Sequence, residues 1–452
     1  MKKRSELQEK DLQYIFHPCA QMKDFEENPP LVITKGEGLY LIDEEGKRYM
    51  DCISSWWVNL FGHANPRINQ VVMEQIHDLE HVIFASFSHK PAIELAEALV
   101  EVLPQGINKF LFADNGSSCI EMALKLSFQY HLQTGNPQKT KFISLENAYH
   151  GETIGALGVG DVDIFTQTYR PLIKEGRKVR VPYLDNTKSE EEFAVYEEEC
   201  IQELKKLIES SHHEIACMIV EPMVQGAAGM LMYSANYLKQ VRELTRRYNI
   251  HLIDDEIAMG FGRTGKMFAC EHAGITPDIM CLAKGLSSGY YPIAMACITT
   301  DIFNAFYADY KEGKSFLHSH TYSGNPLGCR VAVEVLRIFR EENILAMVQE
   351  KGEYLQTKME ELFQGREYVK SYRRMGMIGA IELHDIPGQE RMGRKIAALA
   401  LEKGVLIRPI GNIVYFMPPY IITKGEIDTM LEVCKVSMEE YIEQIKNKGE
   451  MV

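Results

Sequence analysis

The sequence lacks features that would place it in several well-known classes of protein. No uninterrupted apolar run approaches the roughly 20 residues needed to cross a membrane, so we expect no membrane span. Lysine and arginine number 49 against 63 aspartate and glutamate residues, which gives a formal net charge of −14. Because nucleic-acid binding requires a basic surface, we expect no nucleic-acid partner.

Paired cysteines are also missing. The ten cysteines stand singly, at positions such as Cys119 and Cys217, and no two form a Cys-x-x-Cys pair. A zinc site or a thioredoxin-like motif therefore has little support, and we expect no metal. Unpaired thiols are typical of a reducing compartment. The start of the chain, MKKRSELQEKDLQ, has no apolar stretch of the kind that a signal peptide requires, so we expect a cytoplasmic protein.

The residues that are present describe an ordinary globular chain without repeats or low-complexity linkers. Its apolar fraction is 46% and its charged fraction 25%. Its 452 residues exceed what one small core can organise, so two or three domains are expected. We predict an N-terminal segment over residues 1–70 that joins the small domain, a large domain over 71–329 and a C-terminal small domain over 330–452.

Helices and strands are predicted to alternate through the middle of the chain. Residues 38–51 have the pattern of a hairpin around a turn at 43–46. Apolar strands, each followed by a polar cluster, are expected over 109–113, 141–145, 215–220, 250–254 and 279–283. This alternation predicts an α/β fold with a mostly parallel sheet covered on both faces.

Further helices are predicted within this region and after it. After the first of these strands we expect a helix with Ile120, Leu124 and Phe128 on one face. Toward the C-terminus an amphipathic helix is expected over 331–342, then a strand-rich stretch to Ile422 and a last helix from about Gly425. The second pattern is typical of a smaller α+β domain.

Lys284 is the first candidate for chemistry. It stands between an apolar strand and the turn Gly285-Leu-Ser-Ser-Gly289. A lysine just past a strand end is usually a solvated surface residue. Held near a low-dielectric pocket, however, its amine can form an imine with an aldehyde.

Asp255 changes that balance. It lies 29 residues before Lys284, within three consecutive acids at the end of a neighbouring predicted strand. Three such acids could form a solvated loop. A pyridoxal-phosphate (PLP) enzyme, however, needs one carboxylate against the pyridinium nitrogen of its cofactor. Since functional groups gather beyond the carboxyl ends of parallel strands, Asp255 and Lys284 are expected to meet.

A phosphate site is predicted at residues 114–118, Asp-Asn-Gly-Ser-Ser, between a strand and a helix. Backbone N–H groups at a helix N-terminus bind phosphate readily. An ordinary helix cap would explain Ser117 or Ser118 equally well.

A rival motif occurs at residues 260–265, where Gly-Phe-Gly-Arg-Thr-Gly matches the dinucleotide fingerprint G-x-G-x-x-G. It does not follow its strand directly, and no clear amphipathic helix comes after it. A nicotinamide-dependent enzyme is therefore a weak competitor.

Two longer stretches resemble the signature of class III aminotransferases, a family of fold-type I PLP enzymes. One is DDEIAMGFGRTGK over 254–266, and the other is PDIMCLAKGLSSG over 277–289. The resemblance covers nearly the whole chain. It implies a large domain with a mostly parallel seven-stranded sheet beside a smaller α+β domain.

Further markers resemble the branch of this family that serves biotin biosynthesis. They include SSWW over 54–57, NAYHGET over 147–153 and Ala258, where many class III members carry glutamine. The resemblance implies transamination of 8-amino-7-oxononanoate to 7,8-diaminononanoate, with S-adenosylmethionine as the expected amino donor and lysine as an alternative. It also implies a homodimer whose active site lies at the subunit interface.

Roles for individual residues follow from the resemblance. Lys284 would hold PLP as a Schiff base and shuttle a proton, and Asp255 would hold the pyridinium nitrogen. Tyr149 would stack on the cofactor ring and line the substrate pocket. Gly116 and Ser117 would bind the phosphate.

The resemblance also implies residues for the substrates and for the dimer. Across the interface, His320 and Thr321 of the partner subunit would help to bind the phosphate. Arg408 would take the carboxylate of the keto acid, because its planar fork pairs with a carboxylate bidentately. The other residues expected to contact substrate are Trp56, Ser319 and Cys19.

Three positions depart from the best-known members of this branch. Cys19 stands where tyrosine is usual, Met259 where threonine is usual, and Ser319-His320 where Gly-Pro precedes the threonine. These departures leave the donor open between S-adenosylmethionine and lysine. Two further interpretations remain: another class III omega-aminotransferase, and a cofactor-binding protein that has lost catalysis.

Overall fold

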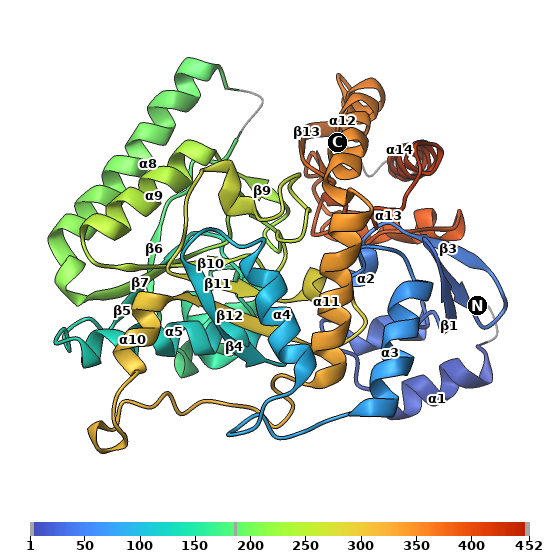
Figure 1. The fold of residues 1–452 in the computed structure, drawn as a ribbon. Coiled ribbons are helices and arrows are strands. Elements are labelled where there is room, and N and C mark those ends of the chain that lie inside the picture. The colour runs from blue at the N-terminus through green and yellow to red at the C-terminus, as the bar shows by residue number, and fades with distance from the viewer. Residues whose placement is uncertain (1–3, 185–187, 448–452) are drawn as a thin grey trace.

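The computed structural model describes residues 4–184 and 188–447. Residues 1–3 of the predicted N-terminal segment and residues 448–452 of the predicted C-terminal domain lie outside it. Its largest unit is a seven-stranded sheet with helices on both faces (Figure 1). The strand order is β4-β12-β11-β10-β7-β5-β6. The strands are β4 (Ile107–Ala113), β5 (Lys141–Leu145), β6 (Arg177–Val179), β7 (Ile215–Val220), β10 (His251–Asp255), β11 (Ile279–Leu282) and β12 (Ala294–Thr299).

The sheet confirms the expected α/β fold with a mostly parallel sheet. Strands β11, β10, β7, β5 and β6 run parallel to one another, whereas β12 is antiparallel to both β11 and β4. The predicted strands at 141–145 and 215–220 have the observed bounds, and those at 109–113, 250–254 and 279–283 differ from the observed strands by one or two residues. The parallel strands bring the polar clusters that follow them to one edge.

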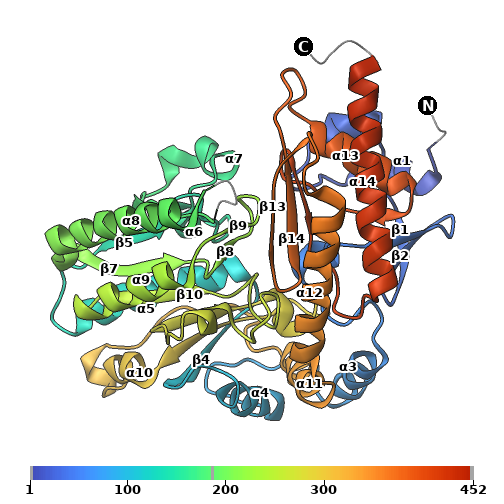
Figure 2. The same ribbon diagram turned by 90° about the horizontal axis from the view of Figure 1, so that it is seen from above.

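Burial on both faces explains why these strands are apolar at every position. In β7, Met218 and Val220 face one core, whereas Cys217 and Ile219 face the other. The first core also holds residues of α4 (Lys90–Val100), α8 (Glu190–Ser211) and α9 (Ala235–Arg247). The second holds α5 (Gly116–Gln133) and Ile302 of α10 (Thr300–Phe306). Figure 2 shows α8 and α9 lying along the sheet.

The C-terminal part combines helices with a small antiparallel sheet. Strands β13 (Val369–Met375), β14 (Ile378–Leu383) and β16 (Ile413–Phe416) pair in that order. The helices are α11 (Pro326–Glu341), α12 (Ile344–Phe363), α13 (Met392–Glu402) and α14 (Lys424–Asn447). The predicted helix at 331–342 and the last helix are confirmed. The stretch up to Ile422 is not simply strand-rich as expected, because α12 and α13 occupy much of it.

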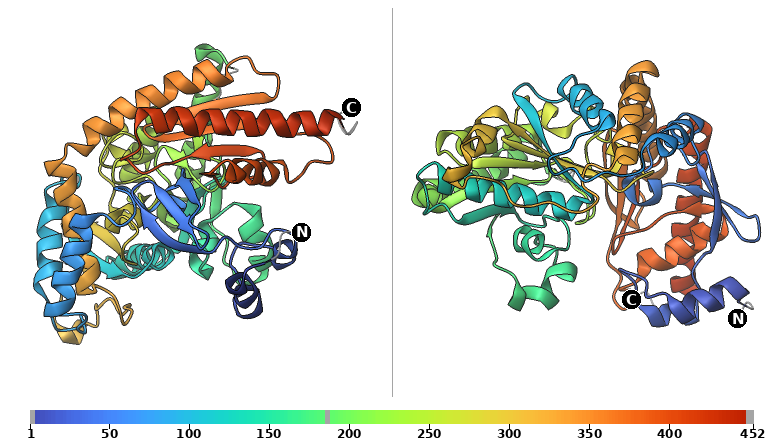
Figure 3. Two further views of the ribbon diagram at one scale, coloured as in Figure 1. Left: turned by 90° about the vertical axis from the view of Figure 1, so that its right-hand side faces the viewer. Right: turned by 60° about the horizontal axis from the view of Figure 1, so that its bottom comes forward.

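The N-terminal segment lies beside this C-terminal part (Figure 3). The predicted hairpin is present as β2 (Tyr40–Asp43) and β3 (Arg48–Asp51), with β1 (Ile33–Glu37) on its outer edge. On the other edge, β3 pairs in parallel with β15 (Val405–Leu406). Segments from both ends of the chain therefore share one sheet. The domain boundaries at residues 70 and 329 stay predictions.

The remaining elements are shorter, apart from two helices near the N-terminus. They are α1 (Glu6–Tyr14), α2 (Ser54–Trp57), α3 (Pro66–Asp78), α6 (Ile154–Val159), α7 (Asp163–Thr166), β8 (Val224–Gln225) and β9 (Leu231–Met232). Among the described residues, no helix combines the length and the apolar character required to span a bilayer. Nine of the ten free cysteines are buried, as expected of thiols that act as small hydrophobes, and Cys19 is exposed.

Helix α5 is held against the sheet by a buried pair of histidines. The rings of His131, on α5, and His251, on β10, stack with their centroids 4.7 Å apart. His131 Nε2 donates to the carbonyl of Ala216 at 2.9 Å, and His251 Nδ1 lies 2.9 Å from the hydroxyl of Ser127. Burial lowers the pKa of His131 to about 3 and that of His251 to about 4. Ile120 and Leu124 of α5 are buried as predicted, whereas Phe128 is exposed.

We predict that the histidine pair makes the protein sensitive to mild acid. Both rings stay neutral in the fold but accept protons in the unfolded chain below about pH 6.5. Stability is therefore lost as the pH falls from 6.5 toward the folded-state pKa values, by roughly 2 kcal/mol per ring at pH 5. His131→Gln keeps an N–H donor near Ala216 and cannot titrate. Thermal melts should show a smaller drop in Tm between pH 7.5 and 5 for this variant than for the wild type; an equal drop would contradict the assignment.

Candidate active site

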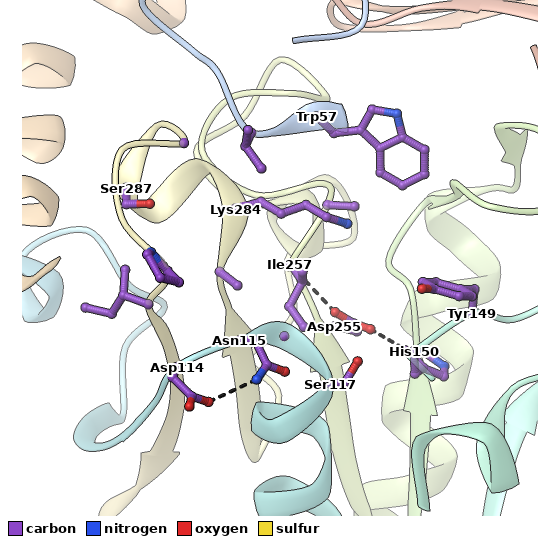
Figure 4. Close-up of a pocket in the computed structure, with 18 of the residues that line it drawn as sticks. Trp57, Asp114, Asn115, Ser117, Tyr149, His150, Asp255, Ile257, Lys284 and Ser287 are labelled. Carbon is purple, nitrogen blue, oxygen red and sulfur yellow. Dashed lines mark hydrogen bonds and ion pairs between the residues drawn. The ribbon is translucent and has the colours of Figure 1, made fainter. Parts of the chain in front are cut away.

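A cavity of about 470 Å³ opens at the carboxyl edge of the seven-stranded sheet. Its walls come from the ends of β10 and β11, from the N-terminus of α5 and from the loop after β5 (Figure 4). Five of the predicted site residues line it: Gly116, Ser117, Tyr149, Asp255 and Lys284. The structure thus brings together residues that are up to 168 positions apart in the sequence.

Lys284 extends into this cavity instead of pointing into solvent (Figure 4). Its ammonium nitrogen lies 4.6 Å from the centroid of the Trp57 ring. Its backbone adopts a left-handed conformation with φ of 45°, which is costly for a residue other than glycine and is a recurrent feature of functional sites. Burial lowers the pKa of the Lys284 amine, and the nearby carboxylates of Asp255 and Glu221 act in the opposite direction.

Asp255 is a buried carboxylate that faces the same cavity. Only 4% of the residue is exposed. Its Oδ2 lies 2.7 Å from His150 Nδ1, and its Oδ1 accepts the N–H of Ile257 at 3.2 Å. Since a carboxylate offers about four acceptor sites, Asp255 can take a further donor from the cavity. His150 orients the carboxylate for that donor.

The alternative of a solvated acidic loop is excluded, because Asp254 and Glu256 are buried as well. They project to the opposite side of the strand from Asp255. Their carboxylate oxygens and the sulfur of Cys270 lie within 4.8 Å of one another. Burial raises the pKa of Asp254 well above its ordinary value and that of Glu256 to about 7. This pair therefore holds a proton near neutral pH, which limits the negative charge behind Asp255.

Helix α5 points its N-terminus at the cavity. The helix cap is Asn115, whose side-chain oxygen accepts the N–H of Ser118 at 2.9 Å. Neither Ser117 nor Ser118 is the cap, and the Ser117 hydroxyl accepts the N–H of Glu152 at 3.3 Å. A Cβ at Gly116 would come within 3.2 Å of Ile257. First-turn N–H groups lack partners within a helix and attract anions.

Tyr149, in the loop after β5, forms another wall of the cavity. Its hydroxyl donates to Glu152 at 2.8 Å, and its backbone N–H donates to Glu221 at 2.9 Å. Its ring packs against Phe165 with the centroids 5.0 Å apart. These contacts present an oriented aromatic surface to the cavity (Figure 4).

The two tryptophans separate into different environments. Trp57 lines the cavity and is 4% exposed, whereas Trp56 does not line it and is 44% exposed. All four residues from Ser54 to Trp57 have positive φ, between 47° and 73°, so they form a strained left-handed turn. Asp51 stabilises the turn by accepting the N–H and the hydroxyl of Ser55 at 3.0 and 2.7 Å.

Three of the predicted substrate residues form a separate group outside the cavity. The guanidinium of Arg408 lies 4.7 Å from the centroid of the Trp56 ring, and its Nη2 donates to the carbonyl of Cys19 at 3.4 Å. Partial desolvation raises the pKa of the Cys19 thiol although the residue is exposed, and nearby Glu152 acts in the same direction. Because Glu152 also accepts the Tyr149 hydroxyl, this group adjoins the cavity wall.

The segment Ser319-His320-Thr321 also lies outside the cavity. Ser319 and Thr321 are exposed. His320 Nδ1 lies 2.9 Å from the carboxylate of Asp114, a cavity-lining residue next to the α5 N-terminus. Within one chain, His320 therefore adjoins the predicted phosphate site. The contact predicted across a dimer interface stays a prediction.

Several residues of the site were not singled out from the sequence. His150 and Trp57 lay inside recognised motifs, but only tertiary contacts show their positions. Arg263, in the rejected dinucleotide motif, is fully buried and donates to the carbonyls of Trp57, Asn59 and Pro418 at 2.9–3.2 Å. It anchors the turn that carries Trp57.

These residues fit PLP, the cofactor that the resemblance implies. Lys284 offers an amine, Asp255 offers a free acceptor for a ring N–H⁺, and the α5 N-terminus offers N–H groups for a phosphate. All three face one cavity, and Tyr149 supplies an aromatic wall. Hydrophobic residues such as Ile257, Ala258 and Ile293 also line it.

Comparison with known proteins gives a consistent result over nearly the full length. The profile of the family described as Aminotransferase class-III matches residues 22–437. The adenosylmethionine-8-amino-7-oxononanoate aminotransferase of Helicobacter pylori is 45% identical over 422 residues, which cover 92% of this chain and 94% of that protein. The protein of the same name from Geobacter sulfurreducens is 41% identical, over 94% of this chain and 96% of that protein.

Solved structures agree with this result. The crystal structure of the adenosylmethionine-8-amino-7-oxononanoate aminotransferase from Methanocaldococcus jannaschii superposes with a TM-score of 0.90 at 36% identity, covering 96% of this chain and 98% of that chain. An omega transaminase from Pseudomonas jessenii, solved in complex with PMP, superposes with a TM-score of 0.92 at 31% identity, covering 98% of this chain and 99% of that chain.

We predict that His150 is required for tight cofactor binding. His150→Ala removes the partner of a buried carboxylate, which costs about 1–3 kcal/mol, so the Kd for PLP should rise roughly 10-fold or more. His150→Asn keeps an N–H near the position of Nδ1 and should recover most of the affinity. Titration of the apoenzyme with PLP, followed by tryptophan fluorescence, measures both; equal Kd values for His150→Ala and the wild type would contradict the role.

Proposed function

Because the chain belongs to the class III aminotransferase family, we propose that it transfers an amino group to 8-amino-7-oxononanoate and so makes 7,8-diaminononanoate. The protein is a PLP-dependent aminotransferase. The relatives described above support the acceptor, since they share its name at up to 45% identity over more than nine-tenths of the chain. The observation that Lys284 and Asp255 line one cavity supports PLP-dependent transamination.

The reaction needs no external oxidant or reductant. The donor exchanges its C–NH₂ group for a carbonyl, and the C7 carbonyl of the acceptor becomes C–NH₂, so the two half-reactions balance. When bound, PLP supplies an aldehyde for amine exchange and a pyridinium ring that withdraws electrons from the reacting carbon.

Lys284 is proposed as the residue that holds the cofactor and moves the proton. Its amine stands at the cavity wall with Asp255 and Glu221 nearby. Burial lowers its pKa, so a larger fraction of the amine is neutral and able to accept a proton at Nζ. The Trp57 ring, 4.6 Å away, limits the access of water from that side.

Asp255 and the N-terminus of α5 are proposed to orient the cofactor at its two ends. With His150 at 2.7 Å, Asp255 is placed to accept the ring N–H⁺. Gly116 and Ser117 are proposed to bind the phosphate through the first turn of the helix. Tyr149 is proposed to stack on the ring between them.

The group of Arg408, Trp56 and Cys19 outside the cavity is proposed to contact the substrate. Arg408 is suited to bind the carboxylate of the keto acid, and Trp56 lies against its guanidinium at 4.7 Å. Cys19 touches Arg408 through its carbonyl. Ser319 is proposed as a further contact.

We also propose a homodimer in which His320 and Thr321 of the partner subunit help to bind the phosphate. Exposed apolar side chains around that segment support the proposal, since Leu317 is 86% and Tyr322 62% exposed in the single chain. A cytoplasmic location stays a prediction from the sequence.

Another class III omega-aminotransferase activity is the second candidate. The likeness to the Pseudomonas jessenii omega transaminase favours it. Ala258, which replaces the glutamine of many class III members, and the Trp56-Trp57 pair favour the first candidate. A screen of keto-acid and aldehyde acceptors separates the two.

We predict that Lys284→Ala abolishes attachment of PLP. Borohydride treatment of the wild type should fix one PLP per chain on the peptide that contains Lys284, detected by mass spectrometry. The variant should carry none and should lose activity by at least about 1,000-fold, as expected when a covalent and proton-transferring group is removed. A borohydride-fixed cofactor in Lys284→Ala would disprove the assignment.

The amino donor is predicted to be S-adenosylmethionine. In stopped-flow spectra, the visible absorbance of the bound cofactor should fall on addition of this donor and remain unchanged with lysine at the same concentration. The donor that bleaches the absorbance in a single turnover is the true one. If lysine alone bleaches the absorbance, lysine is the donor and S-adenosylmethionine is not, and the acceptor assignment is unaffected.

A further inference from the structure

We propose that Glu221 is a positioning residue of the active site, which holds two walls of the cavity together and supplies a second negative charge beside Lys284. This inference rests on the proposed function, because it concerns the same cavity. It assigns a role to a carboxyl group that neither cofactor binding nor substrate binding requires.

The position of Glu221 follows from the register of the sheet. Strands β7 and β10 are parallel, and Val220 pairs with Asp254. The next residues, Glu221 and Asp255, therefore leave adjacent strands side by side. Both line the cavity, and each is 4% exposed. A single cavity thus contains two buried carboxyl groups and one lysine.

Both oxygens of Glu221 bind backbone N–H groups of different walls. Oε1 accepts the N–H of Tyr149 at 2.9 Å, and Oε2 accepts the N–H of Gly226 at 3.0 Å. Tyr149 belongs to the loop after β5, and Gly226 follows β8. A Cβ at Gly226 would lie 3.0 Å from the ring of Trp57. Glu221 therefore sets the distance between the Tyr149 wall and the Trp57 wall.

The charge of Glu221 acts on Lys284. Its carboxylate accepts two neutral backbone N–H groups and forms no ion pair with them, so its charge acts on the other charged groups of the cavity. Burial and the neighbouring Asp255 raise the pKa of Glu221, whereas its two backbone N–H bonds and Lys284 lower it, and the resulting pKa is about 8. With this pKa, Glu221 carries its negative charge above about pH 8 and loses it as the pH falls.

Groups that titrate surround Glu221 from every adjoining element. Asp255 comes from β10, Lys284 from the turn after β11 and Tyr149 from the loop after β5. The buried phenols near it are Tyr183 and Tyr233. Burial raises the pKa of both phenols, so they stay neutral, and the pH response is carried by Glu221 and Lys284.

The test uses the holoenzyme of Glu221→Gln without substrate. The variant removes the negative charge and turns one hydrogen-bond acceptor into a donor. The visible absorbance of the cofactor bound to Lys284 changes as the nitrogen of Lys284 loses its proton. Because a nearby anion stabilises the protonated form, the midpoint of this pH titration should fall by about 0.5 unit or more in the variant.

Two further variants separate charge from position. Glu221→Asp keeps the charge but shortens the side chain, so its titration midpoint should stay near that of the wild type while the KM for the amino donor rises several-fold. Glu146→Gln is the matched control: Glu146 follows β5 at the same edge of the sheet but does not line the cavity. Its midpoint and KM should equal those of the wild type.

The proposal is overturned if Glu221→Gln binds PLP with an unchanged midpoint, or if Glu146→Gln shifts the midpoint equally. If Glu221→Gln does not fold, Glu221→Asp decides, and wild-type values of its KM overturn the positioning role. The titration contains no substrate, so it does not depend on which acceptor the enzyme uses. Failure of the borohydride test at Lys284 would instead remove the proposed function itself.

Discussion

The active site depends on one carboxylate that is held in place inside the protein. Asp255 is 4% exposed at the end of a central strand, and burial of an uncompensated charge is strongly unfavourable. The structure compensates it with His150 at 2.7 Å and the N–H of Ile257 at 3.2 Å. The neighbouring acids Asp254 and Glu256 share a proton, so they add little charge behind it. What remains is an oriented anion with room for one cationic donor, and the other parts of the cavity are arranged around it.

The wall that carries Trp57 and Lys284 is built from strained backbone. Lys284 and the residues 54–57 have left-handed conformations, which cost of order 1–3 kcal/mol each for residues other than glycine. Surrounding contacts hold them in place. Asp51 accepts the N–H of Ser55. The buried guanidinium of Arg263 donates to the carbonyls of Trp57 and Asn59 and so fixes the backbone on either side of Val58. Strain and its compensation together place the Trp57 ring against the reactive amine.

Much of the fold could be read from the sequence because strands buried on both faces are continuous apolar runs. The strands at 141–145 and 215–220 were predicted with the observed bounds. Helices α12 and α13 were missed, although buried residues such as Leu355 and Met359 in α12 and Ile396 and Ala400 in α13 recur four positions apart. At the site, Lys284, Asp255 and Gly116 were found because each stands in a distinctive local pattern. Glu221 has no such pattern, and His150 lies in a recognised motif that does not show its position; the contacts of both depend on partners 72 and 105 positions away.

The sequence by itself determined the family and the α/β alternation and singled out Lys284 and Asp255 as candidates, because these features lie in contiguous motifs and in strand periodicity. Only the tertiary structure decided which tryptophan lines the cavity, that all three acids of residues 254–256 are buried, and that Arg408, Trp56 and Cys19 form a group of their own. Those outcomes depend on strand register and on a left-handed turn, in which a change of one residue reverses the direction of a side chain. Local sequence does not specify that direction, whereas the packing of distant segments does.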